Sequence, residues 1–201
     1  MTKKRILTLV TGGFDPLHSG HIAYFEQAKD LTNYLVVGLN TEEWLTNKKG
    51  QYFMSWKERA EIIRHLDVVD AVITVEDDEY GSACSAIERC LEIAQTVVFA
   101  NGGDRGSNNT PEMDRFGNDP RVEMEFGVGG TDKKNSSSWL LHNYFERQRK
   151  IVGIYCIIIT FLLMNNGNVS EYVWRTHPYP MILQKRKWHN QYCKRLVILL
   201  K

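Results

Sequence analysis

The stretch Thr11–His21 reads T-G-G-F-D-P-L-H-S-G-H, and it decides which fold the surrounding sequence can adopt. A short apolar run, I-L-T-L-V at 6–10, precedes it and has the composition of a buried strand. Two glycines allow a tight turn with close approach of a ligand, and Pro16 is placed to set φ within that turn. Ser19 or His18 can then open a helix whose unpaired N–H groups point back over the strand end. The sequence therefore predicts a strand, a turn and a helix, with an anion site at the turn.

Two histidines strengthen this interpretation. His18 and His21 stand three positions apart, so they share a face of the first helical turn and can direct two imidazole N–H donors at one phosphate. Gly20, between them, leaves room for that phosphate. Alone, such a pair is as often a surface feature or the start of a metal site. Its position directly after a strand favours the anion site.

The whole stretch resembles the G-x-F-D-x-x-H-x-G-H signature of the H-x-G-H nucleotidyltransferases, whose branches include cytidylyltransferases and adenylyltransferases. The residues that match are Gly12, Phe14, Asp15, His18, Gly20 and His21. The resemblance covers roughly residues 6–142. It implies transfer of CMP or AMP from CTP or ATP to a phosphorylated acceptor, and it places Gly12, Gly13, Phe14, Asp15 and Gly20 at the nucleotide.

Length and composition limit the possible domain count, cellular compartment and metal content of the protein. The chain has 201 residues, enough for one ordinary domain and a short appendage, and an apolar content of 43% supports a core. The first residues lack a secretory pattern, and the four cysteines show neither C-x-x-C pairs nor zinc-finger spacing. We therefore expect reduced thiols, a cytoplasmic location and no protein metal site.

The net charge of +1 conceals two different segments. Residues 1–145 contain 15 Lys and Arg against 22 Asp and Glu, a net charge of −7, whereas residues 146–201 contain 10 against 2, a net charge of +8. We predict a nucleotidyltransferase domain at 1–145 and a basic, apolar appendage at 146–201. An acidic main domain argues against nucleic acid as a partner, because nucleic-acid surfaces carry clustered positive charge.

Alternating strand and helix signals predict a Rossmann-like α/β fold, a doubly wound parallel sheet with a C-terminal appendage. Strands are expected at 6–10, 34–40, 70–75, 96–100 and 121–126, with helices at 22–31, 55–66 and 82–94. The polar segment 41–54 is predicted to be a mobile loop, and 106–120 a long loop that acts as a lid or flap.

Further site residues follow from the resemblance. The family's second signature ends in hydroxyl residues, and K-K-N-S-S-S at 133–138 matches it through Ser136, Ser137 and Ser138. Hydroxyls at a helix N-terminus suit β- and γ-phosphates, although simple helix capping is the alternative. Asp104, in G-G-D, matches the K-G-G-D of the heptose-phosphate branch, which favours a sugar phosphate over glycerol phosphate. Asp15 is expected to hold the turn, to lie beside the acceptor, or both.

The implied mechanism is an in-line attack of the acceptor phosphate on the α-phosphorus, with pyrophosphate leaving. His18 and His21 would stabilise the charge, and Mg²⁺ would act on the β- and γ-phosphates. Lys48 as a catalytic group and Lys49 as a nucleotide ligand would close over the triphosphate, although a solvated surface pair is equally compatible with the sequence.

Several alternatives stay open. A degenerate relative that binds nucleotide as a sensor without turnover is the alternative function, and a homodimer is compatible with the sequence. The apolar run at 151–164 is shorter than the roughly 20 residues of a membrane span. A small domain, a membrane-surface segment and a truncated remnant remain for 146–201.

Overall fold

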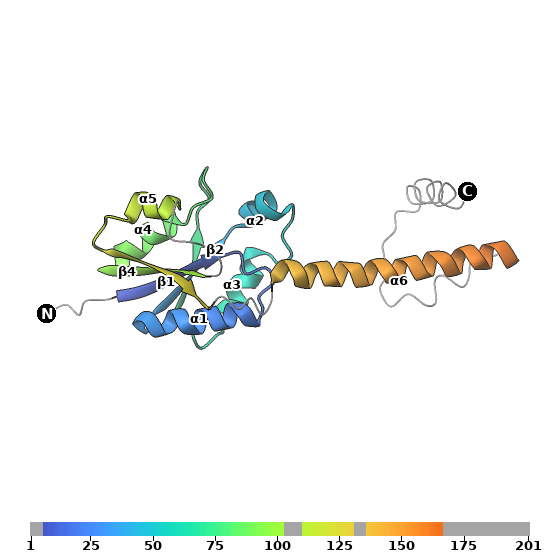
Figure 1. Cartoon of the computed structure of the whole chain (residues 1–201), viewed down its shortest axis with the longest axis horizontal. Helices are drawn as coiled ribbons and strands as arrows, with labels where there is room; N and C mark the ends of the chain where they lie inside the picture. Colours follow the sequence, from blue (N-terminus) through green and yellow to red (C-terminus); the bar gives the residue numbers. More distant parts are fainter. Residues whose placement is uncertain (1–5, 103–109, 131–135, 167–201) are drawn as a thin grey trace. The chain divides into compact units, whose positions relative to one another are not determined.

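Five parallel strands form one sheet in the computed structural model. The structure describes residues 6–102, 110–130 and 136–166, and helices lie on both sides of the sheet (Figure 1). The strand order is β3-β2-β1-β4-β5. From β1 the chain adds β2 and β3 on one side of the sheet, and it then returns to add β4 and β5 on the other side of β1. The strands are β1 (Ile6–Gly12), β2 (Leu35–Asn40), β3 (Ala71–Val75), β4 (Thr96–Gly102) and β5 (Val122–Val128). This is the predicted doubly wound α/β fold, and ligands bind such sheets beyond the carboxyl ends of the strands at the crossover.

Two apolar cores lie on opposite faces of the sheet. On one face, β1 and β2 side chains pack against Phe25 and Ala28 of α1 (Ser19–Thr32) and Ile63 of α3 (Trp56–Arg64). On the other, Leu9 and Phe99 belong to a core that includes α4 (Cys84–Ile93) and Phe116 of α5 (Pro111–Phe116). Strand side chains alternate between faces, so consecutive residues at each strand end point to different helices.

Two predicted loops contain helices. Within 41–54 lies α2 (Glu42–Lys49): Thr41 Oγ1 accepts from the Trp44 amide at 3.0 Å, and Gly50 ends the helix with φ 83°. Within 106–120, Thr110 caps α5 and Pro111 takes its first turn; residues 103–109 lie outside the described part. Both loop predictions were therefore wrong at these positions, because short polar helices lack the apolar periodicity that marks longer ones.

The last described helix, α6 (Ser137–Asn166), begins at the predicted serine run. The chain divides into two compact units between Tyr144 and Phe145, and the two domains expected at 1–145 and 146–201 stay a prediction. Within the described residues, no helix is both long enough and apolar enough to cross a bilayer. The remainder of the appendage, 167–201, lies outside the described residues, so the alternatives for it stay as the sequence left them.

Candidate active site

The turn after β1 brings its backbone close to neighbouring side chains. A Cβ on Gly13 would lie 2.6 Å from Leu45 Cδ2, and one on Gly12 would lie 2.9 Å from Phe14 Cζ. Phe14 has φ 45°, a conformation that costs a non-glycine residue on the order of 1 kcal/mol or more. Its ring lies edge-on to His21 and to Phe25, each with centroids 4.9 Å apart. This buried aromatic packing offsets the backbone strain and keeps the turn open toward the strand ends.

Asp15 holds this turn from behind. Its carboxylate is 2% exposed and accepts from the Phe53 amide at 2.6 Å and the Met54 amide at 2.8 Å. The side chain does not belong to the lining of the cavity in front of the turn. Of the two predicted roles for Asp15, the structure therefore shows the one that holds the turn.

Arg59 of α3 completes the support. Its Nη1 donates to Gly13 O at 2.8 Å and to Asn40 O at 2.9 Å, and its Nε donates to Met54 O at 3.1 Å. The residue is 1% exposed, and burial lowers its pKa while Asp15 and Glu42 act to raise it. A guanidinium with several donors in a fixed fork can join the ends of β1 and β2 to the segment before α3.

The two predicted histidines stand at the start of α1 with their rings stacked, centroids 3.7 Å apart. His18 is the N-cap: Gly20 N donates to His18 Nδ1 at 3.1 Å, and His18 N donates to His21 Nδ1 at 3.3 Å. Because each Nδ1 accepts a hydrogen bond, each neutral ring carries its proton on Nε2. The local helix cap thus fixes both tautomers and leaves two Nε2–H donors for a ligand.

Both histidines favour the neutral form. Burial, followed by repulsion from His18 and Lys49, lowers the pKa of His21 to about 3. Burial and Lys49 also lower the pKa of His18. At neutral pH the pair therefore supplies hydrogen-bond donors at the head of a helix without adding two full positive charges.

The cationic groups of the site come from α2. Lys48 Nζ lies 4.3 Å from the ring centroid of Trp44, and Lys49 Nζ donates to Asp15 O at 3.4 Å. Although Lys49 as a whole residue is exposed, burial at its ammonium lowers its pKa, and Asp15 opposes that shift. Both lysines are exposed residues that line the same cavity as the histidines, so the nucleotide role and the solvated pair both stay predictions.

The serine run lies partly at the site. Ser137 Oγ donates to Pro16 O at 2.9 Å, so the start of α6 is joined to the turn, and Ser136 and Ser137 line the cavity. Ser138 is exposed and is not among the lining residues. Asp104 and 133–135 lie outside the described residues, so the prediction for Asp104 is unchanged.

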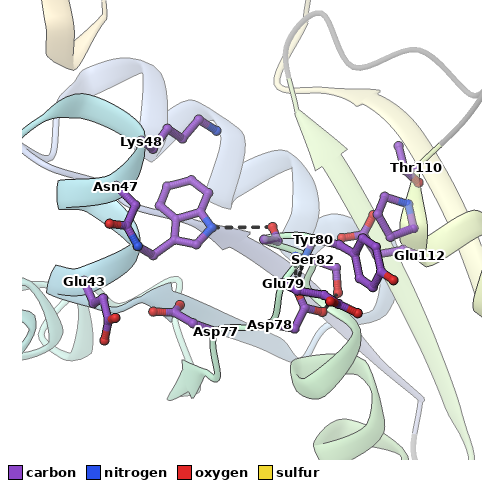
Figure 2. Close-up of a pocket in the computed structure, with 13 residues that line it drawn as sticks. Glu43, Asn47, Lys48, Asp77, Asp78, Glu79, Tyr80, Ser82, Thr110 and Glu112 are labelled. Carbon is purple, nitrogen blue, oxygen red and sulfur yellow. Dashed lines mark hydrogen bonds between the residues drawn. The ribbon is translucent and has the colours of Figure 1, made fainter.

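The histidine pair, the two lysines, Ser136 and Ser137 line a cavity of about 910 Å³ beyond the carboxyl ends of β1, β2 and β4. A second recess of about 630 Å³ shares Trp44, Lys48, Ser82 and Glu112 with it. Figure 2 shows this recess, with Lys48 on α2 at one side, Glu112 at the other and Asp77 below. The volume suits a nucleotide with part of a second substrate, since ligand pockets usually measure roughly 300–1,000 Å³.

Comparison with known proteins agrees with this geometry. The family model described as "Cytidylyltransferase-like" matches residues 9–124, more than half of the chain. The chain belongs to this family. A bifunctional protein HldE of Pelobacter propionicus is 31% identical over 150 residues, which cover 70% of this chain but 28% of that protein. An FAD synthase of Thermococcus sibiricus is 44% identical over 78 residues, covering 38% of this chain and 53% of that enzyme.

Among solved structures, a lipopolysaccharide core biosynthesis protein from Thermoplasma volcanium is similar to this chain. It has 22% sequence identity and a TM-score of 0.47, with 61% of this chain and 93% of that one covered. The present chain spans about a quarter of the length of the HldE protein and about half of the FAD synthase.

Sequence reasoning missed several residues that line or support this candidate site. Arg59 interrupts the buried face of α3 between apolar positions, and a charge there was the available signal. Trp44 was overlooked because its helix was taken for a loop. Asn40 and Asn101 follow the apolar runs of β2 and β4 directly, the place where parallel sheets keep ligands.

Proposed function

We propose that this chain is a nucleotidyltransferase that moves CMP or AMP from CTP or ATP to the phosphate of a sugar or polyol. The observation that carries the proposal is the fixed histidine pair. Both Nδ1 atoms accept from backbone amides of the α1 cap, so Nε2–H is the remaining donor of each neutral ring, and both residues line the cavity. Family membership and the resemblance of the surrounding motif support the same reaction class.

In the proposed reaction, a phosphate oxygen of the acceptor forms a bond to the α-phosphorus of the nucleoside triphosphate. The bond from the α-phosphorus to the bridging oxygen breaks, and that oxygen leaves as part of pyrophosphate with the electron pair. Negative charge grows on the bridging and equatorial oxygens during this step. The Nε2–H donors of His18 and His21 would contact those oxygens, where preorganised donors contribute most.

The lysines supply the charge that the neutral histidines do not. Lys48 and Lys49 line the same cavity as the histidines and would contact the β- and γ-phosphates, with the Ser136 hydroxyl as a further donor. Ser137 already donates its hydroxyl to Pro16 O and would hold the start of α6 beside the turn. Imidazole and ammonium groups in this arrangement would position the triphosphate for direct attack. The proposed reaction therefore needs no covalent enzyme intermediate.

Mg²⁺ is proposed to arrive bound to the triphosphate. The described residues include no group of three or more His, Cys, Asp or Glu side chains with metal-binding geometry. The donors near the phosphates are nitrogen groups, which Mg²⁺ disfavours, so phosphate oxygens and water would hold it. When bound, it would neutralise charge on the leaving pyrophosphate.

A screen for pyrophosphate release tests the proposal. The chain would be incubated with Mg²⁺, CTP or ATP, and one of several acceptors: sugar phosphates, glycerol 3-phosphate, and FMN because of the similarity to an FAD synthase. We expect release that needs one nucleotide and one sugar or polyol phosphate. Nucleotide binding without pyrophosphate from any acceptor would instead support the sensor alternative.

A matched pair of variants makes the screen specific to the site. His18→Ala removes an Nε2–H donor from the cavity, whereas His65→Ala removes a histidine whose side chain is 74% exposed at the end of α3. The proposal expects release to fall with His18→Ala and to stay near the wild-type rate with His65→Ala. Equal rates for the two variants would remove the histidine pair from the mechanism.

A further inference from the structure

Charge is divided between the two sides of the cavity. The cationic and imidazole groups, Lys48, Lys49, His18 and His21, come from α2 and the start of α1. Toward α4 and α5 the lining polar residues are Asn40, Ser82, Asn101 and Glu112, each no more than 5% exposed. The first side of the cavity would bind phosphate groups. The second side offers amides, a hydroxyl and a carboxylate, which can form hydrogen bonds with uncharged polar groups of a ligand.

On this second side, the side-chain amide of Asn101 has a donor without a hydrogen-bond partner. Phe99 packs in the core beneath α4, and the alternation of β4 puts the Asn101 side chain on that same face, one layer nearer the cavity. The residue lines the cavity and is 4% exposed, and its Nδ2 atom is buried without a hydrogen-bond partner. Buried donors are normally paired, so an unpaired donor on a residue that lines a substrate cavity points to a ligand atom that accepts from it once the side chain meets the ligand.

The surrounding groups decide what that ligand atom is. Glu112 lines the same side and both recesses, and its Oε1 accepts from the Ala83 amide at 2.6 Å. The adjoining recess carries Asp77, Asp78 and Glu79, which Figure 2 shows between α2 and Glu112. A second phosphate or a carboxylate would be repelled there. An ammonium group cannot accept from Asn101, whereas a hydroxyl can accept from the amide and donate to a carboxylate.

We propose that Asn101 is a specificity-determining residue that donates through Nδ2 to a hydroxyl of the acceptor, so that the acceptor is a polyol or sugar phosphate recognised by its hydroxyls. This inference rests on the proposed function and adds a subsite to it. The acceptor phosphate lies with the lysines and histidines, and its hydroxylated carbon chain extends across the strand ends toward α4.

Measurements of acceptor binding in the absence of turnover test this subsite separately from the proposed reaction. Calorimetry and saturation-transfer NMR would follow D-ribose 5-phosphate and D-glucose 6-phosphate, each beside its 2-deoxy analogue, and glycerol 3-phosphate, with a nonhydrolysable CTP or ATP analogue and Mg²⁺ present. Four proteins of 201 residues would be compared, beginning with the wild type. Asn101→Leu removes the donor, and Asn101→Asp replaces it with an oxygen. Asn118→Asp is the control, because that asparagine is exposed.

The proposal expects both Asn101 variants to bind the preferred hydroxylated phosphate at least tenfold more weakly than the wild type, with the nucleotide analogue within twofold. It also expects Asn101→Leu to reduce the preference for that ligand over its deoxy analogue, because a site built to bind a hydroxyl discriminates strongly against its absence. Asn118→Asp should match the wild type.

Three results overturn the inference: wild type that binds none of the polyol or sugar phosphates, Asn101 variants that bind them within twofold of wild type, or variants that lose nucleotide affinity equally. Normal nucleotide affinity shows that the site of a variant is folded. If Asn101→Leu has lost that affinity through misfolding, the acceptor affinity of Asn101→Asp decides whether the inference holds. Failure of the proposed function looks different: acceptor binding that depends on Asn101, with no pyrophosphate released.

Discussion

Replacing Asp15 with asparagine tests whether this residue works as a support or as a substrate contact. In Asp15→Asn the shape is kept, but one of the two oxygens that accept from the Phe53 and Met54 amides becomes an NH₂ group. One backbone N–H then faces another donor in a site that is 2% exposed, and the remaining hydrogen bond loses its charged acceptor. A hydrogen bond to a charged group contributes about 1.5–3 kcal/mol, so we expect the unfolding free energy to fall by about 3 kcal/mol.

Urea denaturation with an unchanged slope would measure this loss, and the melting temperature should drop by about 6–12 °C for a domain of this size. Asp67→Asn, at an exposed aspartate, is the control and should alter stability by less than about 0.5 kcal/mol. A loss below about 1 kcal/mol at Asp15, together with a raised KM for the acceptor, would refute the reasoning and return Asp15 to the substrate side.

The remaining predictions concern the histidines and lysines. Alanine at His18 or His21 should lower kcat by on the order of a hundredfold in steady-state assays, with a smaller change in nucleotide KM, because both donors are worth most in the transition state; lost affinity at normal kcat would contradict this. The His21 pKa of about 3 lies below the unfolded value of 6.5, so its stabilising contribution is present above pH 6.5 and is lost as pH falls toward 3. Denaturation at pH 7 and pH 5 should show a decline about 2 kcal/mol larger in wild type than in His21→Asn, and equal declines would mean that this imidazole takes up its proton normally. Lys48→Ala or Lys49→Ala should raise nucleotide KM, and nucleotide with Mg²⁺ should slow proteolysis at 50–52; unchanged kinetics and equal cleavage would place both lysines outside the site.

The fold could be predicted because its signals are local. The apolar runs of the strands, the glycine turn and the helix opened by His18 are each read from a few adjacent residues, and the parallel sheet follows from their alternation. Helix α2 was missed because Leu45 is its one buried residue, so its sequence carries no apolar stripe. Its signals were the cap residues Thr41 and Gly50, which also occur in ordinary turns.

The candidate site could be predicted only in part for a different reason. The anion donors stand together in sequence, so His18 and His21 could be found directly. The support of Asp15 comes from amides 38 and 39 positions away, and that of Gly13 from Arg59, 46 positions away. Such pairs depend on how helices meet the sheet, which no spacing rule in one sequence specifies. Asn101 escaped notice because an asparagine after a strand becomes informative only once its burial and unmet donor are known.

The attachments of α2 limit how far its lysines can travel. Only the cap residue Thr41 separates the end of β2 at Asn40 from the start of α2 at Glu42. Asp15 fixes the backbone again at Phe53 and Met54. Only Gly50, Gln51 and Tyr52 lie between the end of the helix and that second anchor, a tether that spans at most about 10 Å when extended. Closure over a nucleotide would thus be a tilt of one short helix about Thr41, with amplitudes of a few ångströms at the lysines.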